Sequence, residues 1–286
     1  MDELYTRVSN ATKQVLYQYM KDGDISLLSY KFSYFFQNCI QENQIQVISH
    51  HFSNHKIEGL TVVDRLGTSF SYERDNPKVK QNFTLCHELG HFILKHNGFY
   101  FAESVDNQED VLEREANIFS AVVLMPDIVL LSKIYYNCET FQRVQNSLEV
   151  SKQALFFRLL DFLREHYPGK DSEIKQAVET YIEGKNASIF RLFHDIREQI
   201  IKEFHQFQPS LINRIKQRIS NVGFVTSQEY PDLLNQDNWK EIKEECINLK
   251  TWLIYNKGKS IAYVWDKEKF SDKEARKKAE LQLLLM

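Results

Sequence analysis

The stretch TLCHELGHFILKH (residues 84–96) holds two histidines four positions apart, with a glutamate directly after the first. In an α-helix, residues i and i+4 share one face about one turn apart, so His87 and His91 can offer imidazole nitrogens to one metal ion. Zinc accepts such nitrogens at about 2.0–2.1 Å. Glu88 lies at the rim of that face and can accept a proton from a water molecule that the metal activates. The spacing predicts a zinc-dependent peptidase with Glu88 as its catalytic base.

The same pattern also occurs by chance, as two surface histidines that flank an acid on an ordinary helix. The surrounding residues favour the metal site. They are apolar nearly all round, which indicates a buried helix, and buried histidine or glutamate is costly unless it is paired or bound to a metal ion. Gly90 weakens a helix, so its presence is easier to understand if another backbone or a substrate passes close to it.

A catalytic zinc site needs a third protein ligand and one open position. One peptidase signature places a third histidine six residues after the second, with a glycine between them. Here that position holds Asn97, the glycine position holds Leu94, and His96 comes one residue too early. The sequence therefore places His96 outside the ligand set and turns attention to a glutamate on a following helix.

The segment LEREANIFSAVVLMP (residues 112–126) supplies such a glutamate. Glu113 and Asn117 are i, i+4 neighbours on one helix face. Glu113 can bind the metal ion, and Asn117 can hydrogen-bond the outer nitrogen of a histidine or orient Glu113. Ala116 is small and allows this helix to approach the HELGH helix closely. We therefore predict Glu113 as the third ligand, from the Glu-x-x-Ala-Asn spacing.

Two roles have alternatives at this point. Glu115 lies about 200° round the helix from Glu113, so both cannot face the ion, and Glu109 lies one turn before Glu113. Glu115 and Glu109 are the alternatives for the third ligand. Tyr72 and His96 are conceivable donors to the oxyanion of a tetrahedral intermediate, although a packed tyrosine and a helix-end histidine are the simpler interpretations.

The elements that must position these residues are helices and short strands. Periodicity and capping signals predict helices at residues 2–20, 26–42, 79–96 and 108–125, and a helical pair at 139–164. Short runs at 44–49, 59–64 and 68–73 are candidate strands, and the last of them alternates between aromatic and polar positions. The strand at Phe70–Glu73 precedes the HELGH helix and is a candidate sheet edge for an extended substrate. This pattern predicts an α+β, mainly helical domain with a small sheet.

The turn at Tyr167-Pro168-Gly169 is the best domain break in the chain. It predicts a first domain at 1–167 and a second α+β domain at 168–286. The second domain is predicted to be mostly helical to about residue 220, and then to form a hairpin at 251–265 that turns at Gly258. Ser271 and Glu274 form a capping box that opens a last helix.

Composition bounds the function classes. With 286 residues, 43% hydrophobic and 26% charged, the chain is globular, and its net charge of −3 provides no strong basic field for nucleic acid or anionic membrane. The helical pair at 139–164 resembles a helix-turn-helix, but Phe156, Phe157, Leu159 and Leu160 predict packing rather than base reading. We expect no direct binding to nucleic acid.

The location is predicted from cysteines and apolar runs. Cys39, Cys86, Cys138 and Cys246 lie far apart, which fits free thiols in a reducing compartment. The first ten residues have no apolar core typical of a signal peptide. The longest apolar run, residues 118–131, is interrupted by Pro126 and is too short to span a bilayer. We therefore expect a cytoplasmic protein without a membrane segment.

QNFTLCHELGHFILKH (81–96) followed by EREANIFSAVVLMP (113–126) resembles the ImmA/IrrE family of metallopeptidases, of the gluzincin kind. SLEVSKQALFFRL (147–159) resembles the helical pair that often follows in this family, so the resemblance spans about residues 25–164. Cys86 departs from the family pattern, which usually has a small residue such as alanine there. It could add a sulfur ligand, but its helical direction differs, and core packing is the better interpretation.

The resemblance implies a zincin-like domain with zinc on His87, His91 and Glu113, and with Glu88 as the base. It also implies a protein substrate, commonly a DNA-binding repressor of the phage-repressor type, whose cleavage releases the genes of a mobile element or a stress response. The ligand types do not distinguish zinc from manganese or iron.

A second hypothesis is a zinc-containing binding or sensor module that regulates a partner protein without proteolysis. About 120 residues after the break carry no catalytic motif. In this hypothesis, residues 168–286 are the sensor or the surface of a homodimer.

Overall fold

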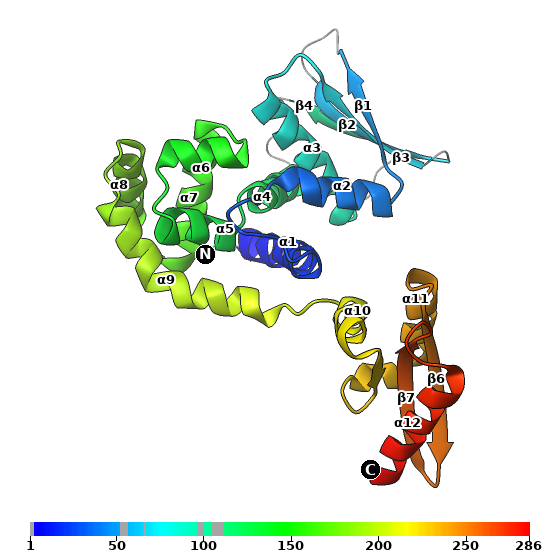
Figure 1. Cartoon of the computed structure of the whole chain (residues 1–286). Helices are drawn as coiled ribbons and strands as arrows, with labels where there is room; N and C mark the ends of the chain where they lie inside the picture. Colours follow the sequence, from blue (N-terminus) through cyan, green and yellow to red (C-terminus); the bar gives the residue numbers. More distant parts are fainter. Residues whose placement is uncertain (1–2, 52–56, 66, 97–99, 105–110) are drawn as a thin grey trace. The chain divides into compact units, whose positions relative to one another are not determined.

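The computed structural model describes residues 3–51, 57–65, 67–96, 100–104 and 111–286. The chain divides into two compact units, residues 1–208 and 209–286 (Figure 1). Both units combine helices with a sheet, so the chain has the α+β class that its sequence predicts.

The elements of the first unit lie close to those predicted from the sequence. Its strands are β1 (Gln46–His50), β2 (Ile57–Asp64), β3 (Gly67–Glu73) and β4 (Tyr100–Ser104). Its helices are α1 (Glu3–Asp22), α2 (Phe32–Glu42), α3 (Lys78–Ile93), α4 (Val111–Leu124), α5 (Asp127–Leu130), the π-helical η1 (Leu131–Tyr136), α6 (Phe141–Leu148), α7 (Lys152–His166), α8 (Asp171–Ile182) and α9 (Ala187–Gln206). Strand β4 was not predicted, and α2 begins at Phe32 rather than at residue 26.

The boundary between the units differs from the predicted one after residue 167. Helix α9 buries Phe193 in the same core as Phe162 of α7, with the two ring centroids 5.6 Å apart. Helices α8 and α9 therefore belong to the first unit. Pro168 and Gly169 form a turn inside that unit, between α7 and α8, and Gly169 has the left-handed φ of 80° that glycine permits.

The sheet of the first unit has the strand order β1-β3-β2-β4. Strand β1 is parallel to β3, and β2 is antiparallel to both β3 and β4. The prediction that Phe70–Glu73 forms a sheet edge is therefore wrong, because β3 pairs on both sides. Among the strands that the structure describes, β1 and β4 are the outer ones.

Helix α3 lies between the sheet and α4, and it contacts β2, β3 and α4. Phe70 of β3 is fully buried and packs edge-on against Phe92 of α3, with ring centroids 6.2 Å apart. Pro77 stands directly before α3, and Pro126 separates α4 from α5. Because residues 84–91 of α3 are all buried, the HELGH helix is a core helix, as its apolar surroundings predict.

A buried ion cluster holds four helices of the first unit together. Lys13 of α1 lies 2.6 Å from Asp127 at the start of α5 and 3.0 Å from Glu203 of α9. Arg158 of α7 donates to the other oxygen of Asp127 and to the carbonyl oxygen of Met125. Burial alone would raise the pKa of Asp127, but Lys13 and Arg158 hold it down at about 2.

The second unit contains α10 (Leu211–Val222), β5 (Phe224–Thr226), the 3₁₀ helix η2 (Pro231–Leu234), α11 (Gln236–Glu245), β6 (Leu249–Asn256), β7 (Lys259–Asp266) and α12 (Asp272–Leu285). Its antiparallel sheet has the order β5-β7-β6. One face packs on α10 and α11, and the other on α12. The predicted hairpin is β6–β7, with Gly258 at a φ of 82°, and the predicted capping box opens α12.

The helical pair is α6 and α7, and its surface is mixed. Leu159 and Leu160 are buried as predicted, whereas Phe157 is half exposed.

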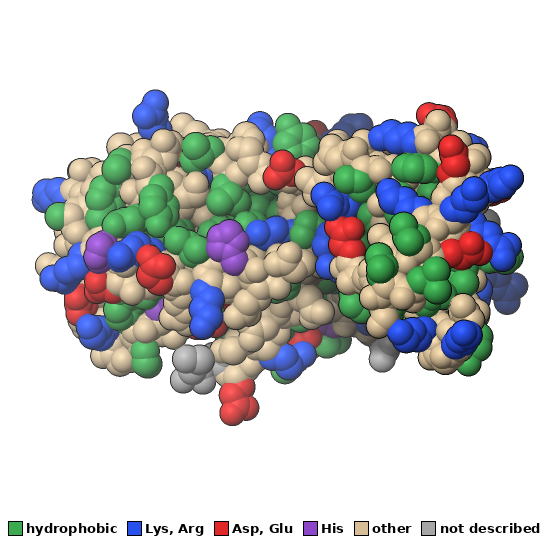
Figure 2. All heavy atoms as spheres, turned by 60° about the horizontal axis from the view of Figure 1, so that its bottom comes forward, with side chains coloured by type: hydrophobic (Ala, Val, Ile, Leu, Met, Phe, Trp, Pro, Cys, Tyr) green, Lys and Arg blue, Asp and Glu red, His purple; other side chains and the backbone are tan. Residues whose placement is uncertain are grey.

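On the face in Figure 2, basic and acidic side chains are interspersed rather than gathered into a field of one sign.

By length and composition alone, the run Val111–Tyr136 could cross a membrane, but 83% of its most apolar window is buried inside the protein, as in a core helix.

Candidate metal centre

The centre is built where α3 crosses α4. A Cβ atom added to Gly90 would lie 3.2 Å from the Cα of Ala116 and 3.1 Å from the Cδ1 of Phe119. Gly90 therefore lets the two helices approach closely, with the backbone of Ala116 against it. The approach brings the histidines of α3 within reach of the first turn of α4.

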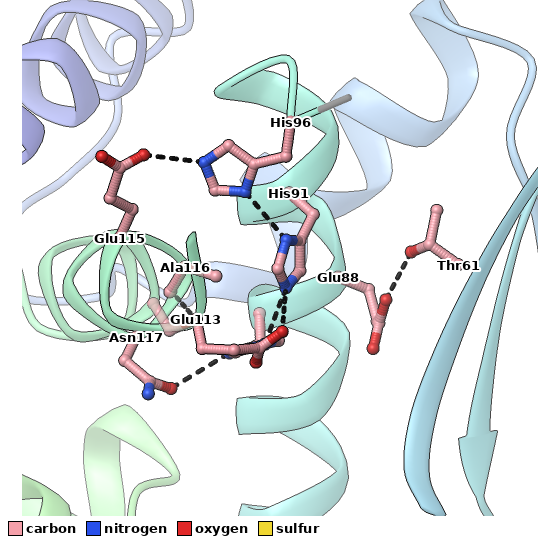
Figure 3. A network of polar contacts seen from close by, with 10 residues as sticks. Thr61, Glu88, His91, His96, Glu113, Glu115, Ala116 and Asn117 are labelled. Carbon is pink, nitrogen blue, oxygen red and sulfur yellow. Dashed lines mark hydrogen bonds and ion pairs between the residues drawn. The ribbon is translucent and has the colours of Figure 1, made fainter. Parts of the chain in front are cut away.

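Two histidine nitrogens and a carboxylate converge beside this crossing, and Figure 3 shows His91 and Glu113 among them. His87 Nε2 lies 3.0 Å from His91 Nε2 and 3.0 Å from Glu113 Oε2, and His91 Nε2 lies 3.5 Å from Glu113 Oε1. Both histidine side chains are 1% exposed and that of Glu113 is 13% exposed. The three residues could hold a metal ion.

The spacing of these atoms fits a tetrahedral ion. Four ligands at zinc's bond lengths of about 2.0–2.1 Å lie about 3.3–3.4 Å from one another, the edge of the tetrahedron. His87 Nε2 lies slightly closer than that edge to His91 Nε2 and to Glu113 Oε2, at 3.0 Å each, and the 3.5 Å from His91 Nε2 to the other carboxylate oxygen, Oε1, is slightly longer than it. The donor set also fits, because two imidazoles and a carboxylate leave one tetrahedral position open, as in catalytic zinc sites.

The outer nitrogen of His87 meets Asn117 on α4. His87 Nδ1 lies 3.0 Å from Asn117 Oδ1. Because an amide oxygen only accepts hydrogen bonds, His87 Nδ1 carries the proton and donates it. The lone pair of His87 is then on Nε2, the atom that faces His91 and Glu113. Asn117 thus lies where it can orient one ligand.

The outer nitrogen of His91 meets a chain of three side chains. His91 Nδ1 lies 2.8 Å from His96 Nδ1, and His96 Nε2 lies 2.8 Å from Glu115 Oε2. The other oxygen of Glu115 accepts from Arg7 of α1. Glu115 is therefore turned away from the three converging atoms, and His96 is engaged between Glu115 and His91. The other alternative ligand, Glu109, lies outside the described residues, as does Asn97.

Glu88 is fully buried and is held by strand β2. Thr61 donates a hydrogen bond from Oγ1 to Glu88 Oε2 (Figure 3). Gly59 lies two residues earlier on the same face of β2, and a Cβ there would come within 2.6 Å of Glu88 Oε1 and 2.5 Å of Thr84 Cγ2. Gly59 thus makes room for the carboxyl that Thr61 orients.

Cys86 and Tyr72 take structural positions. Cys86 is fully buried, its sulfur contacts the carbonyl oxygen of Ser120 at 4.0 Å, and burial raises the pKa of its thiol. A buried neutral thiol is a core group rather than a metal ligand. Tyr72 of β3 is partly buried and packs against the main core. Sequence reasoning missed Thr61, Gly59 and Arg7, because their roles depend on contacts between elements that no local pattern records.

A buried histidine pair one helical turn apart, a carboxylate from a second helix and a glutamate beside the first histidine together define a metallopeptidase-type centre. Residues 40–160 match the family model of the IrrE N-terminal-like domain of the M78 peptidases, and this match supports a metallopeptidase-type function for the segment. The matched segment contains the whole centre except Arg7. No curated protein is significantly similar to the chain.

Proposed function

We propose that the protein is a zinc-dependent endopeptidase that hydrolyses a peptide bond in a regulatory protein. The observation that carries this proposal is the convergence of His87, His91 and Glu113 within 3.0–3.5 Å of one another, with the buried Glu88 adjacent to His87 in the chain. The match of residues 40–160 to the family model of the IrrE N-terminal-like domain supports the same class of chemistry.

His87, His91 and Glu113 would hold the metal ion. When bound, the ion supplies a Lewis acid that polarises a carbonyl group and lowers the pKa of water. Glu88 accepts the proton of the attacking water and later gives it to the departing amine. Thr61 and Gly59 fix the carboxyl of Glu88 for both transfers, and the buried surroundings of α3 keep bulk solvent away from it.

The proposed substrate is a DNA-binding repressor of the phage type, in the cytoplasm. Its support is family resemblance alone, because a site of this kind defines a reaction class rather than a partner. Direct binding of the peptidase to nucleic acid is not part of the proposal.

The test replaces Glu88 with glutamine, which keeps the shape of the side chain but accepts no proton. Glu88→Gln is expected to bind about one zinc ion per chain, as the wild type does, and to lose cleavage by about 10²-fold or more. New protein N-termini would be compared in cells that express the wild type or the variant. Zinc content would be measured on the purified proteins.

N-termini that appear with the wild type and are absent with Glu88→Gln identify the substrate. A matched control is Glu179→Gln, an exposed glutamate on α8 whose side chain is 52% exposed. It should give the wild-type set of termini. Identical termini with and without Glu88 would contradict the proposal, as would a wild type that binds no zinc.

The second candidate is a zinc-containing module that regulates a partner without proteolysis. The observation in its favour is the second unit, residues 209–286, which has its own cores on both faces of its sheet. Such a unit can serve as a sensor or as the surface of a homodimer. Full biological activity of Glu88→Gln would favour this candidate and exclude the first.

A further inference from the structure

The contact between His91 and His96 is produced by the way α3 ends. Lys95 has a left-handed φ of 58°. Its N–H donates to the carbonyl oxygen of Phe92, and the N–H of His96 donates to that of His91. These two bonds form a Schellman motif, which places the residue after the left-handed position against the residue five positions earlier. The motif therefore folds His96 back onto His91, with ring centroids 5.0 Å apart.

The hydrogen bonds that link Arg7, Glu115, His96 and His91 assign the protons of the two imidazole rings. Glu115 is a carboxylate that accepts from Arg7, so the nitrogen facing it, His96 Nε2, must donate. A neutral His96 then has its lone pair on Nδ1. His96 Nδ1 accepts from His91 Nδ1 at 2.8 Å, so His91 is protonated on Nδ1 and has its lone pair on Nε2. That is the atom directed at His87 and Glu113.

This hydrogen-bonded network is buried at His96 and Glu115 and reaches the surface at Arg7. The side chains of His96 and Glu115 are 3% and 9% exposed, whereas that of Arg7 is 63% exposed. Arg7 belongs to α1, which lies outside the segment that matches the family model. Its guanidinium holds Glu115 in the orientation that reaches His96, so a helix outside the matched domain contributes to the centre.

We propose that His96 and Glu115 are positioning residues that hold His91 in the tautomer able to bind the metal ion. This inference rests on the proposed metal site and adds to it a second route of orientation. Asn117 orients His87 with one amide oxygen, and the chain Glu115–His96 does the same for His91. Outer partners of this kind raise the affinity of a site for its metal by fixing ring and proton together.

The first experiment measures zinc affinity by competition with a chromogenic chelator. His96→Phe keeps an aromatic ring but provides no acceptor for His91 Nδ1, and it is expected to weaken zinc binding about 10–100-fold. Glu115→Ala is expected to act in the same direction. The control is His194→Phe, which makes the same change at an exposed histidine of α9 that bonds Tyr135, and its zinc affinity should equal that of the wild type.

A pair of variants at Lys95 tests the turn without touching either ring. Lys95→Pro cannot adopt a positive φ and has no N–H for the Phe92 carbonyl oxygen, whereas Lys95→Gly adopts that φ readily. Lys95→Pro is expected to weaken zinc binding in the same range as His96→Phe, with the helix content unchanged by circular dichroism. Lys95→Gly is expected to bind zinc as the wild type does.

Long-range ¹H–¹⁵N correlation spectra of the zinc-loaded, histidine-labelled protein report which ring nitrogen of each histidine carries the proton. A merely structural role of His96 would not determine these tautomers. His91 is expected to be protonated on Nδ1 and His96 on Nε2. Unchanged zinc affinity in both His96→Phe and Glu115→Ala would overturn the inference while the metal site stands, and so would a His96 protonated on Nδ1. A wild type without zinc affinity would instead overturn the proposed function and this inference with it.

Discussion

Two polar clusters lie buried in the first unit, and they differ in how their charges are balanced. In the ion cluster, Lys13 and Arg158 face Asp127 and Glu203, so each buried charge has a partner of opposite sign within the protein. In the metal centre, the converging atoms are two imidazole lone pairs and the Glu113 carboxylate. The first cluster balances its charges with residues of the protein, whereas the second is a set of donors that could hold a metal ion.

The largest expected effect tests the ion cluster. Asp127→Asn removes the shared negative charge and leaves Lys13 and Arg158 buried beside a neutral amide. Breaking a buried pair in this way costs about 3–5 kcal/mol. Urea unfolding should show that loss in the free energy of unfolding, and the loss should be the same with and without zinc because the cluster is independent of the centre.

Asp171→Asn is the matched control, because Asp171 pairs with Arg164 while its side chain is 67% exposed, and exposed pairs contribute about 0–1 kcal/mol. Lowering the pH also removes the charge of Asp127, and its effect on the free energy of unfolding can be followed in the wild type. The pKa of Asp127 is about 2 in the folded protein against an ordinary value of 3.8, so its contribution is present above pH 3.8 and is lost as the pH falls through about 2. An Asp127→Asn variant as stable as Asp171→Asn would show that the cluster is not a structural anchor.

The second effect tests the metal centre. Zinc at 100 times its dissociation constant should raise the free energy of unfolding by about 2.7 kcal/mol, because it binds the folded centre and not the unfolded chain. Glu113→Ala should abolish this increase, whereas Glu179→Ala on the exposed face of α8 should retain it. Thermal unfolding at several zinc concentrations measures the response. A response equal in Glu113→Ala and the wild type would place the zinc elsewhere.

The contrast between the clusters also explains what the sequence can predict. His87 and His91, or Glu113 and Asn117, are brought together by the period of one helix, so their spacing alone places each pair on one face. Each residue of the ion cluster comes from a different helix, and Lys13 and Glu203 are far apart in the chain, so no local spacing predicts their contact.

The same reason accounts for the positions that sequence reasoning missed. The bond from Thr61 to Glu88 depends on the packing of β2 against α3, and the bond from His96 to Glu115 depends on the crossing of α3 and α4. The Pro168-Gly169 turn carries the local signal of a domain break, but that signal is the same for a turn between two packed helices. Only the core that α8 and α9 share with α7 distinguishes the two cases.

The smallest expected effect on stability tests how finely the metal centre is adjusted. Gly90→Ala gains about 1 kcal/mol of helix propensity, but its Cβ would lie 3.1–3.3 Å from Phe119 and from the Cα of Ala116, so α4 must shift by a few tenths of an ångström. The two contributions oppose each other, and the free energy of unfolding without zinc should change by about 1 kcal/mol or less. Zinc affinity should fall clearly, because Glu113 moves with α4 while both histidines stay on α3.

Chelator competition measures the affinity, and urea unfolding of the zinc-free protein is the internal control. Wild-type affinity in Gly90→Ala would mean that the centre tolerates movement between its helices, and that its close crossing serves packing alone.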